Sequence, residues 1–237
     1  MGNTLIGDSL IMWNLLQEWE GPWIIHCIPY NLDVAEVIHK YVPTLNVKEI
    51  RVHSGNPAMD MRGLNSWIAA HSDNFPRDYV SYHTWQLKPN PRCVFSFPQT
   101  GFVRSPENLV TTQLSSEHGW KSWPEIVPAI VEHREVGTWK RVQSVRPGEN
   151  CDINFEPFQH SLIEVAELLT HVKLHVGVSS AISWLAYLMG VPTVMCQPKG
   201  WDADCLTLED HFRRLESPEI GQIHKAMDEV LTCTSLK

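Results

Sequence analysis

The stretch of the sequence that most clearly suggests chemistry is HVGVSSAISWLAYLMGVPTVMC, residues 175–196. An apolar strand pattern over 172–178 leads into a turn of small residues and then a helix over 179–190, which begins on serines and ends on glycine. Such a start leaves backbone N–H groups of Ser179–Ile182 unpaired. Together with the helix dipole, they favour an anion site that suits a diphosphate. A serine-rich turn that binds nothing is an equally good interpretation of the spacing alone.

Two charged residues lie where a nucleotide could meet them. Lys121 occurs in HGWKSWPEIV (118–127), in a loop just before a predicted helix start. Ligands of open parallel sheets bind at the carboxyl ends of the strands, so a lysine in this loop can contact a phosphate. Gly148-Glu149 follows the strand predicted over 139–145 and can present a carboxylate to ribose hydroxyls. Taken singly, a loop lysine is more often a solvated charge, and a Gly-Glu pair is a weak signal.

Asp8 and two histidines have plain structural interpretations. Asp8 or Ser9 precedes a helical pattern over 9–19, so a helix N-cap is the simplest role for Asp8. His171 and His175 are four residues apart, but 172–178 has strand character and no third ligand accompanies them. We therefore expect core or surface histidines there rather than a metal site.

Strand and helix patterns alternate on both sides of QLKPNPR (86–92), which contains two prolines and predicts a domain linker. Before it, strands over 22–28 and 47–53 flank a helix over 32–42. After it we expect a long polar loop from 99 to about 121 and mostly helical structure in the last forty residues. The other elements expected there are strands over 93–98, 139–145, 172–178 and 191–196, and helices from Pro124, over 160–171 and over 179–190.

This alternation predicts an α/β protein of two Rossmann-like units with parallel sheets, over 1–89 and 90–237. An α/β unit normally opens with an apolar strand, whereas here the loop-like GNTLIGDS already begins at Gly2. Either the first strand of the N-terminal unit is absent or Met1 is not the native start.

Composition narrows the class of protein. The 237 residues carry a net charge of −8, from 19 Lys and Arg against 27 Asp and Glu, so the molecule as a whole is not drawn to nucleic acid or anionic membranes. There is no apolar run of the ~18 residues that a membrane span needs and no signal-peptide pattern, so we expect a cytoplasmic protein. Six scattered cysteines without a C-x-x-C pair predict free thiols rather than disulfides or a zinc site.

The order of these motifs resembles glycosyltransferase family 9, the heptosyltransferase-like enzymes of the GT-B fold. The resemblance rests on Lys-x-Trp-Pro-Glu from Lys121, on Gly148-Glu149 and on VGVSSAISWLA, which is closest to the autotransporter heptosyltransferase branch. The start GNTLIGDSLIMWNLL is similar to the Leu-Gly-Asp-x-Leu loop and first helix of that family.

The resemblance implies an inverting, metal-independent glycosyltransferase that uses a nucleotide-diphosphate sugar and no other cofactor. Asp8 matches the catalytic aspartate, the base for the acceptor hydroxyl, and such a base fits the oxocarbenium-like transition state of glycosyl transfer. The resemblance also implies that the N-terminal unit, which would hold the acceptor, is shortened relative to other members of the family. The C-terminal unit would hold the donor. The donor site implied by the resemblance consists of Thr100, Lys121, Glu149, Ser179, Ser180, Ala181 and Ile182.

Several alternatives remain open at the level of sequence. Ser179 and Ser180 stand where many members have Asp-Thr, so the donor sugar need not be heptose. The acceptor is a protein, a glycan, a lipid or a modified nucleobase in DNA. Two other functions fit the same motifs, namely a non-catalytic nucleotide-sugar-binding protein and a GT-B-fold sugar-nucleotide epimerase or hydrolase.

Overall fold

A computed structural model of the chain describes residues 23–27, 32–41, 47–52, 104–115, 122–159, 161–199 and 210–234. The chain divides into two compact units, of which the second comprises Phe102–Asp202 and Leu208–Lys237. The helix predicted over 9–19, the linker predicted over 86–92 and the strand predicted over 93–98 lie outside the described residues. The domain boundary between 89 and 90 also falls there and stays a prediction.

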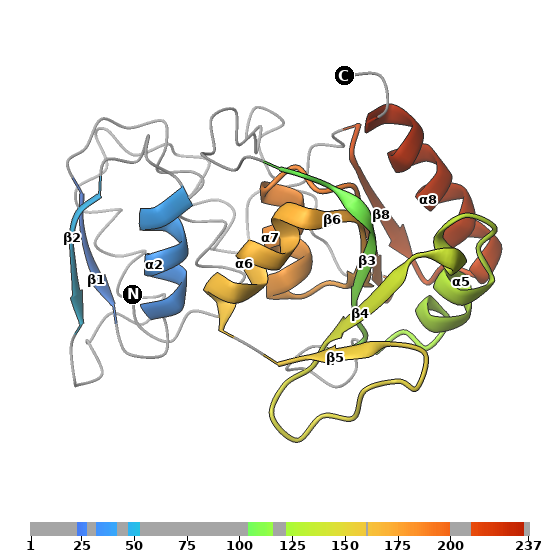
Figure 1. The fold of residues 1–237 in the computed structure, drawn as a ribbon, viewed down its shortest axis with the longest axis horizontal. Coiled ribbons are helices and arrows are strands. Elements are labelled where there is room, and N and C mark those ends of the chain that lie inside the picture. Colours follow the sequence, from blue (N-terminus) through green and yellow to red (C-terminus); the bar gives the residue numbers. More distant parts are fainter. Residues whose placement is uncertain are drawn as a thin grey trace. The chain divides into compact units, whose positions relative to one another are not determined.

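The described part of the first unit is one β-α-β segment. Strands β1 (Trp23–Cys27) and β2 (Val47–Val52) pair in parallel, and α2 (Leu32–Tyr41) connects them (Figure 1). Helix α2 carries Asp33 in its first turn and Lys40 in its last turn, which suits the helix dipole at both ends. The elements predicted over 22–28, 32–42 and 47–53 are therefore confirmed.

The second unit is built on a six-stranded sheet whose strands are all parallel. Its strands are β3 (Glu107–Gln113), β4 (Lys140–Ser144), β5 (Glu156–Phe158), β6 (Val172–Val178), β7 (Thr193–Gln197) and β8 (Phe212–Glu216). Their order across the sheet is β5-β4-β3-β6-β7-β8. This is the doubly wound Rossmann order, in which the direction of winding reverses between β3 and β6.

Two pairs of helices cover the two faces of this sheet (Figure 1). Helices α5 (Ile126–Glu132) and α8 (Ile220–Thr234) lie on one face. Helices α6 (Leu162–His171) and α7 (Ala181–Leu188) lie on the other. The three predicted helices of this unit are confirmed, although α5 begins two residues after Pro124. A short 3₁₀ turn, η6 (Val136–Thr138), leads from α5 toward β4.

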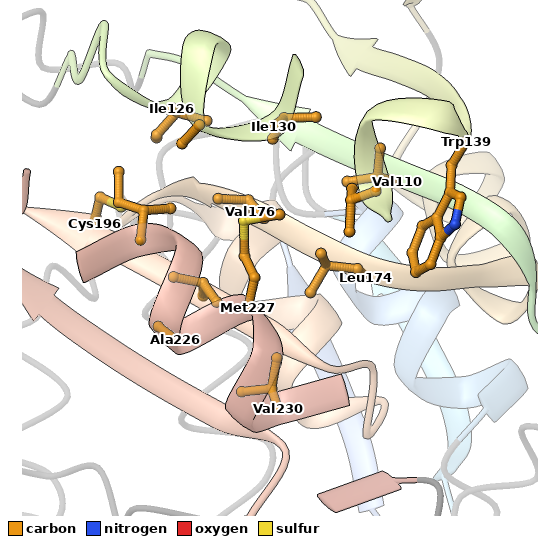
Figure 2. Close-up of a cluster of buried hydrophobic side chains, with 14 of the residues drawn as sticks. Val110, Ile126, Ile130, Trp139, Leu174, Val176, Cys196, Ala226, Met227 and Val230 are labelled. Carbon is orange, nitrogen blue, oxygen red and sulfur yellow. The ribbon is translucent and has the colours of Figure 1, made fainter. Parts of the chain in front are cut away.

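The main hydrophobic core lies between the sheet and the α5–α8 pair (Figure 2). It contains Val110, Ile126, Ile130, Leu174, Val176, Cys196, Ala226, Met227 and Val230. Polar contacts join the same two helices, because His224 Nε2 donates to Ala129 O at 2.9 Å and His133 Nε2 lies 3.2 Å from Asp228 Oδ1. Apolar packing and polar contacts on this face of the sheet therefore stabilise the second unit.

The polar loop predicted over 99–121 is wrong in its middle, because β3 runs through it as a central strand. Thr111, Thr112 and Gln113 end this strand and are buried despite being polar. The Thr111 hydroxyl is satisfied by His175, with Oγ1 and Nδ1 3.0 Å apart, so that this polar residue can occupy a buried strand. These three polar residues remove the apolar pattern by which a buried strand is recognised in a sequence.

The prediction that the last forty residues are mostly helical holds for α8 but misses β8. Strand β8 lies at the edge of the sheet, where charged side chains are tolerated and discourage pairing with other chains. Its Arg213 Nε donates to Glu229 Oε2 of α8 at 2.8 Å. The opposite edge strand, β5, was also not predicted, and it includes Pro157, which edge positions accept.

Cys151, Cys196 and Cys233 are free thiols, as predicted for them. Burial raises the pKa of the Cys196 thiol, so it stays protonated and acts as a small apolar core residue. Among the helices of the described ranges, none combines the length and the apolar character that crossing a membrane requires.

Candidate functional site

The candidate site lies at the carboxyl edge of the second unit's sheet, where β3, β4 and β6 end. In doubly wound sheets the chain leaves neighbouring strands toward opposite faces at the switch point, and ligands bind there. Here the switch point separates β3 from β6. β4 ends one strand further along, and adjacent strands are spaced by about 4.8 Å, so the ends of β4 and β6 are about 10 Å apart across the sheet.

Helix α7 begins at this edge, and its first residues follow directly from the end of β6. Ser180 is its N-cap, and the Ser180 side chain accepts from Ser183 N at 3.3 Å, while Ser179 N donates to Cys196 O at 3.3 Å. In the described part of the chain, the backbone N–H groups of Ser180, Ala181 and Ile182 have no acceptor. Three N–H groups at a helix N-terminus attract an anion such as a phosphate.

Helix α6 can be compared with α7, because a carboxylate of α6 itself, that of Glu164, lies at its N-terminus. At its start the Ser161 N–H donates to Glu164 Oε2 at 2.9 Å, and Glu164 N donates back to Ser161 Oγ at 3.4 Å. This capping box places a carboxylate on the helix N-terminus. The first turn of α7 has no acidic residue. The first turn of α7 thus lacks the carboxylate that α6 carries at its own N-terminus.

Glu149 is positioned by a tight turn after β4. The sequence Arg146-Pro147-Gly148-Glu149 forms a turn closed by Glu149 N donating to Arg146 O at 2.9 Å, and Gly148 has φ of 81°. Proline followed by a glycine with positive φ is the pattern of a type II turn. The turn brings the Glu149 carboxylate back to its own start, where Oε2 accepts from Arg146 N at 2.9 Å.

The same carboxylate is tied to the end of β3. Ser115, two residues after β3, donates its hydroxyl to Glu149 Oε1. The Arg146 guanidinium donates to Ser115 Oγ at 3.2 Å and lies 3.6 Å from Glu149 Oε2. Each carboxylate oxygen can accept about two hydrogen bonds, so Oε1 keeps capacity for a ligand hydroxyl. Glu149 is therefore fixed as an acceptor at the edge that also holds the start of α7.

The loop that follows Glu149 is held by a buried glutamine of β4. Gln143 Oε1 accepts from Asp152 N at 2.8 Å, and Gln143 Nε2 donates to Asn150 O at 3.4 Å. These two bonds fix the backbone one and three residues beyond Glu149. The amide thus supports the position of the carboxylate from within the sheet.

Of the residues predicted for the donor site, Glu149, Ser179, Ser180, Ala181 and Ile182 lie at this one edge. Asp8, Thr100 and Lys121 lie outside the described residues, so their roles stay predictions. Sequence reasoning missed Ser115, Arg146 and Gln143. The RPGE turn was the one local signal that could have pointed to Arg146, because it returns the chain onto that residue.

Gly177, the residue of β6 that pairs with Gln113, shows how tightly the neighbourhood of α7 is packed. A Cβ atom on Gly177 would lie 2.8 Å from His175 Nε2 and 2.9 Å from Ser183 Oγ. We expect Gly177→Ala to lower the free energy of unfolding by about 1–3 kcal/mol, measured by urea denaturation.

Gly221→Ala is the matched control, since a Cβ at this position of α8 would meet no atom within 4 Å. Its stability should stay the same or rise by up to about 1 kcal/mol, because alanine favours helix. Equal losses in the two variants would show that the space around Gly177 is not limiting.

Comparison with solved structures shows which known fold the chain has. No family profile matches the chain, and no curated protein matches its sequence. Among solved structures, a glycosyl transferase family 9 protein from Veillonella parvula DSM 2008 is similar with a TM-score of 0.59, at 13% identity over 97% of this chain and 95% of that one. The ADP-heptose lps heptosyltransferase II of E. coli is similar with a TM-score of 0.59, at 11% identity over 99% of this chain and 98% of that one.

These likenesses extend over nearly the whole chain and show its fold. The chain has the α/β fold of GT-B glycosyltransferases. The fold expected from the family 9 resemblance is therefore confirmed.

Proposed function

We propose that the chain is an inverting, metal-independent glycosyltransferase whose second unit binds a nucleotide-diphosphate sugar. The observation that carries the proposal is the pairing of two groups at one sheet edge. The start of α7 offers the N–H groups of Ser180, Ala181 and Ile182 to a diphosphate, and Glu149 offers a fixed carboxylate to hydroxyls. A nucleoside diphosphate carries both partners, with its ribose on one side and its phosphates on the other.

The chemistry of the reaction fits this arrangement. The leaving group of glycosyl transfer is the nucleoside diphosphate, on which negative charge develops as the bond to the sugar breaks. Aligned N–H groups at the start of α7 stabilise that charge without needing a metal ion. In this proposal Lys121 and Thr100 add further contacts to the phosphates, and Asp8 takes the proton of the attacking acceptor hydroxyl.

The two similar structures support the proposal because both proteins are named as glycosyltransferases. The name of one includes ADP-heptose, so ADP and ADP-heptose are the first ligands to try. The acceptor is any of the classes left open by the sequence. Location in the cytoplasm, where nucleotide sugars are made, belongs to the same proposal.

The proposal predicts selective stabilisation by one nucleotide family. Melting temperatures should be measured with ADP, UDP, GDP, CDP and ADP-heptose. At concentrations about 100-fold above Kd, the bound ligand should stabilise the protein by about 2.7 kcal/mol. The Lys121→Ala variant should bind the selected nucleotide about tenfold to a hundredfold more weakly, because it lacks a charged contact worth about 1.5–3 kcal/mol.

The matched control is Lys225→Ala, which removes a lysine of α8 whose side chain is 79% exposed. This variant should bind like the unaltered protein. The donor-site assignment would be overturned if no nucleotide raised the melting temperature. It would be confined to the α7 and Glu149 groups if Lys121→Ala bound like the control.

A further inference from the structure

His175 occupies an unusual position for a histidine. It is the fourth residue of β6, a strand whose two faces are both covered by helices, and its side chain is fully buried. Strands buried on both faces are normally built from apolar residues. The His175 Nδ1 atom lies 3.0 Å from Thr111 Oγ1 on β3, and Nε2 lies 2.9 Å from Ser183 Oγ on α7. The imidazole thus connects the central strand to the first turn of the helix.

The directions of the hydrogen bonds that link Thr111, His175 and Ser183 follow from the donors available. The Ser183 hydroxyl donates to Val178 O at 2.7 Å, so its oxygen can only accept from His175 Nε2. Nε2 therefore carries the proton of a neutral ring, and Nδ1 accepts from the Thr111 hydroxyl. Burial lowers the pKa of His175 to about 3, which keeps the ring neutral. Both ring nitrogens are satisfied.

Ser183 transmits this constraint to the turn that holds the anion site. The Ser183 hydroxyl donates a hydrogen bond to Val178 O, the last carbonyl of β6. The same hydroxyl oxygen lies 3.3 Å from Ser180 Oγ, the N-cap side chain. The backbone N–H of Ser183 also donates to Ser180 Oγ at 3.3 Å. Val178 and Ser180 flank Ser179, so one hydroxyl ties together both ends of the turn. The N–H groups proposed to bind the diphosphate begin in that turn, at Ser180.

We propose that His175 is a positioning residue, which holds Ser183 so that the first turn of α7 presents its N–H groups to the diphosphate of the donor. This inference rests on the proposed function. His175 is fully buried and acts through Ser183, so it should affect binding of the phosphates and not binding of the nucleoside. Gly177 leaves the space in which the His175–Ser183 bond forms.

The test compares a nucleoside diphosphate with its nucleoside by calorimetry. We use the base selected in the melting experiment and the variants His175→Leu and His175→Gln. Leucine fills the site but cannot donate to Ser183, whereas the glutamine amide can. His175→Leu should weaken the diphosphate about tenfold and change the nucleoside affinity less than twofold, while His175→Gln should recover most of the loss. Equal weakening of both ligands, or no weakening, would overturn the proposal.

Two further variants protect this test against general loss of stability. Ser183→Ala removes the hydroxyl that transmits the constraint, keeps a good helix former, and should reproduce the His175→Leu phenotype. Ser161→Ala removes the N-cap of α6, so it should lower the melting temperature but leave diphosphate affinity unchanged. A loss of diphosphate affinity in Ser161→Ala comparable to that in Ser183→Ala would attribute the effect to stability alone.

Hydrogen exchange measured without ligand distinguishes failure of the proposed function from failure of the role proposed for His175. In His175→Leu, amides of the first turn of α7 should exchange faster than in the unaltered protein, while those of α8 should not change. Unchanged exchange in α7 would overturn the role of His175. Faster exchange in a protein that binds no nucleotide would retain the positioning role and reject the proposed function.

Discussion

Asp8→Asn is expected to slow glycosyl transfer by about 10²–10⁴-fold, the usual contribution of a positioned general base. Asparagine has nearly the same shape as aspartate but cannot take a proton from the acceptor hydroxyl. It is also an equally good helix N-cap, so the substitution leaves the plain structural role of Asp8 intact. Stability and nucleotide affinity should therefore not change, and the loss should appear in turnover alone.

The measurement is release of the nucleoside diphosphate from the nucleotide sugar selected by melting, with candidate acceptors and with water alone. Asp33→Asn, in the first turn of α2, is the control with the same chemical change. Unchanged turnover in Asp8→Asn would reduce Asp8 to a helix cap. Binding without turnover in the unaltered protein would instead identify a non-catalytic nucleotide-sugar-binding protein, and an altered sugar without acceptor would identify an epimerase or hydrolase.

The elements that sequence alone could predict are those with an apolar pattern of their own. Strand β6, with Val172, Leu174, Val176 and Val178, and helix α6, with its capping box, both show such patterns locally. Strand β3 does not, because Thr111, Thr112 and Gln113 end it. Its burial depends on β4, β6 and the hydroxyl acceptor His175, which lies 64 residues away from Thr111. A local pattern cannot contain that information.

In the candidate site, too, some features are local in the sequence and others depend on distant residues. The serine-rich turn before α7 and the RPGE turn before Glu149 are local signals, since capping and turn chemistry act over four residues or so. The partners of these turns come from elsewhere. Ser115 reaches Glu149 across 34 residues, and Thr111 reaches His175 only because β3 and β6 pair at the switch point. The serine-rich turn and the RPGE turn could therefore be found in the sequence, whereas the side chains that hold them could not.

Ile130→Ala is expected to lower the free energy of unfolding of the second unit by about 2–5 kcal/mol, the range for large-to-small changes in a well-packed core. Ile130 lies on α5, is fully buried and faces the sheet and α8 (Figure 2). Removing its side chain leaves a cavity between rigid layers that cannot easily close. A domain is stable by only about 5–15 kcal/mol, so this one change removes a large share of the total.

Ile153→Ala is the matched control, because it deletes the same atoms from a side chain that is 98% exposed. Its free energy of unfolding should change by less than about 0.5 kcal/mol. Both are measured by urea denaturation followed by circular dichroism. Comparable losses would mean that α5 does not form a core with α8. Because α7 and His175 lie on the opposite face of the sheet, folded Ile130→Ala should still bind the nucleotide as the unaltered protein does, which separates the residues that stabilise this unit from those that shape its site.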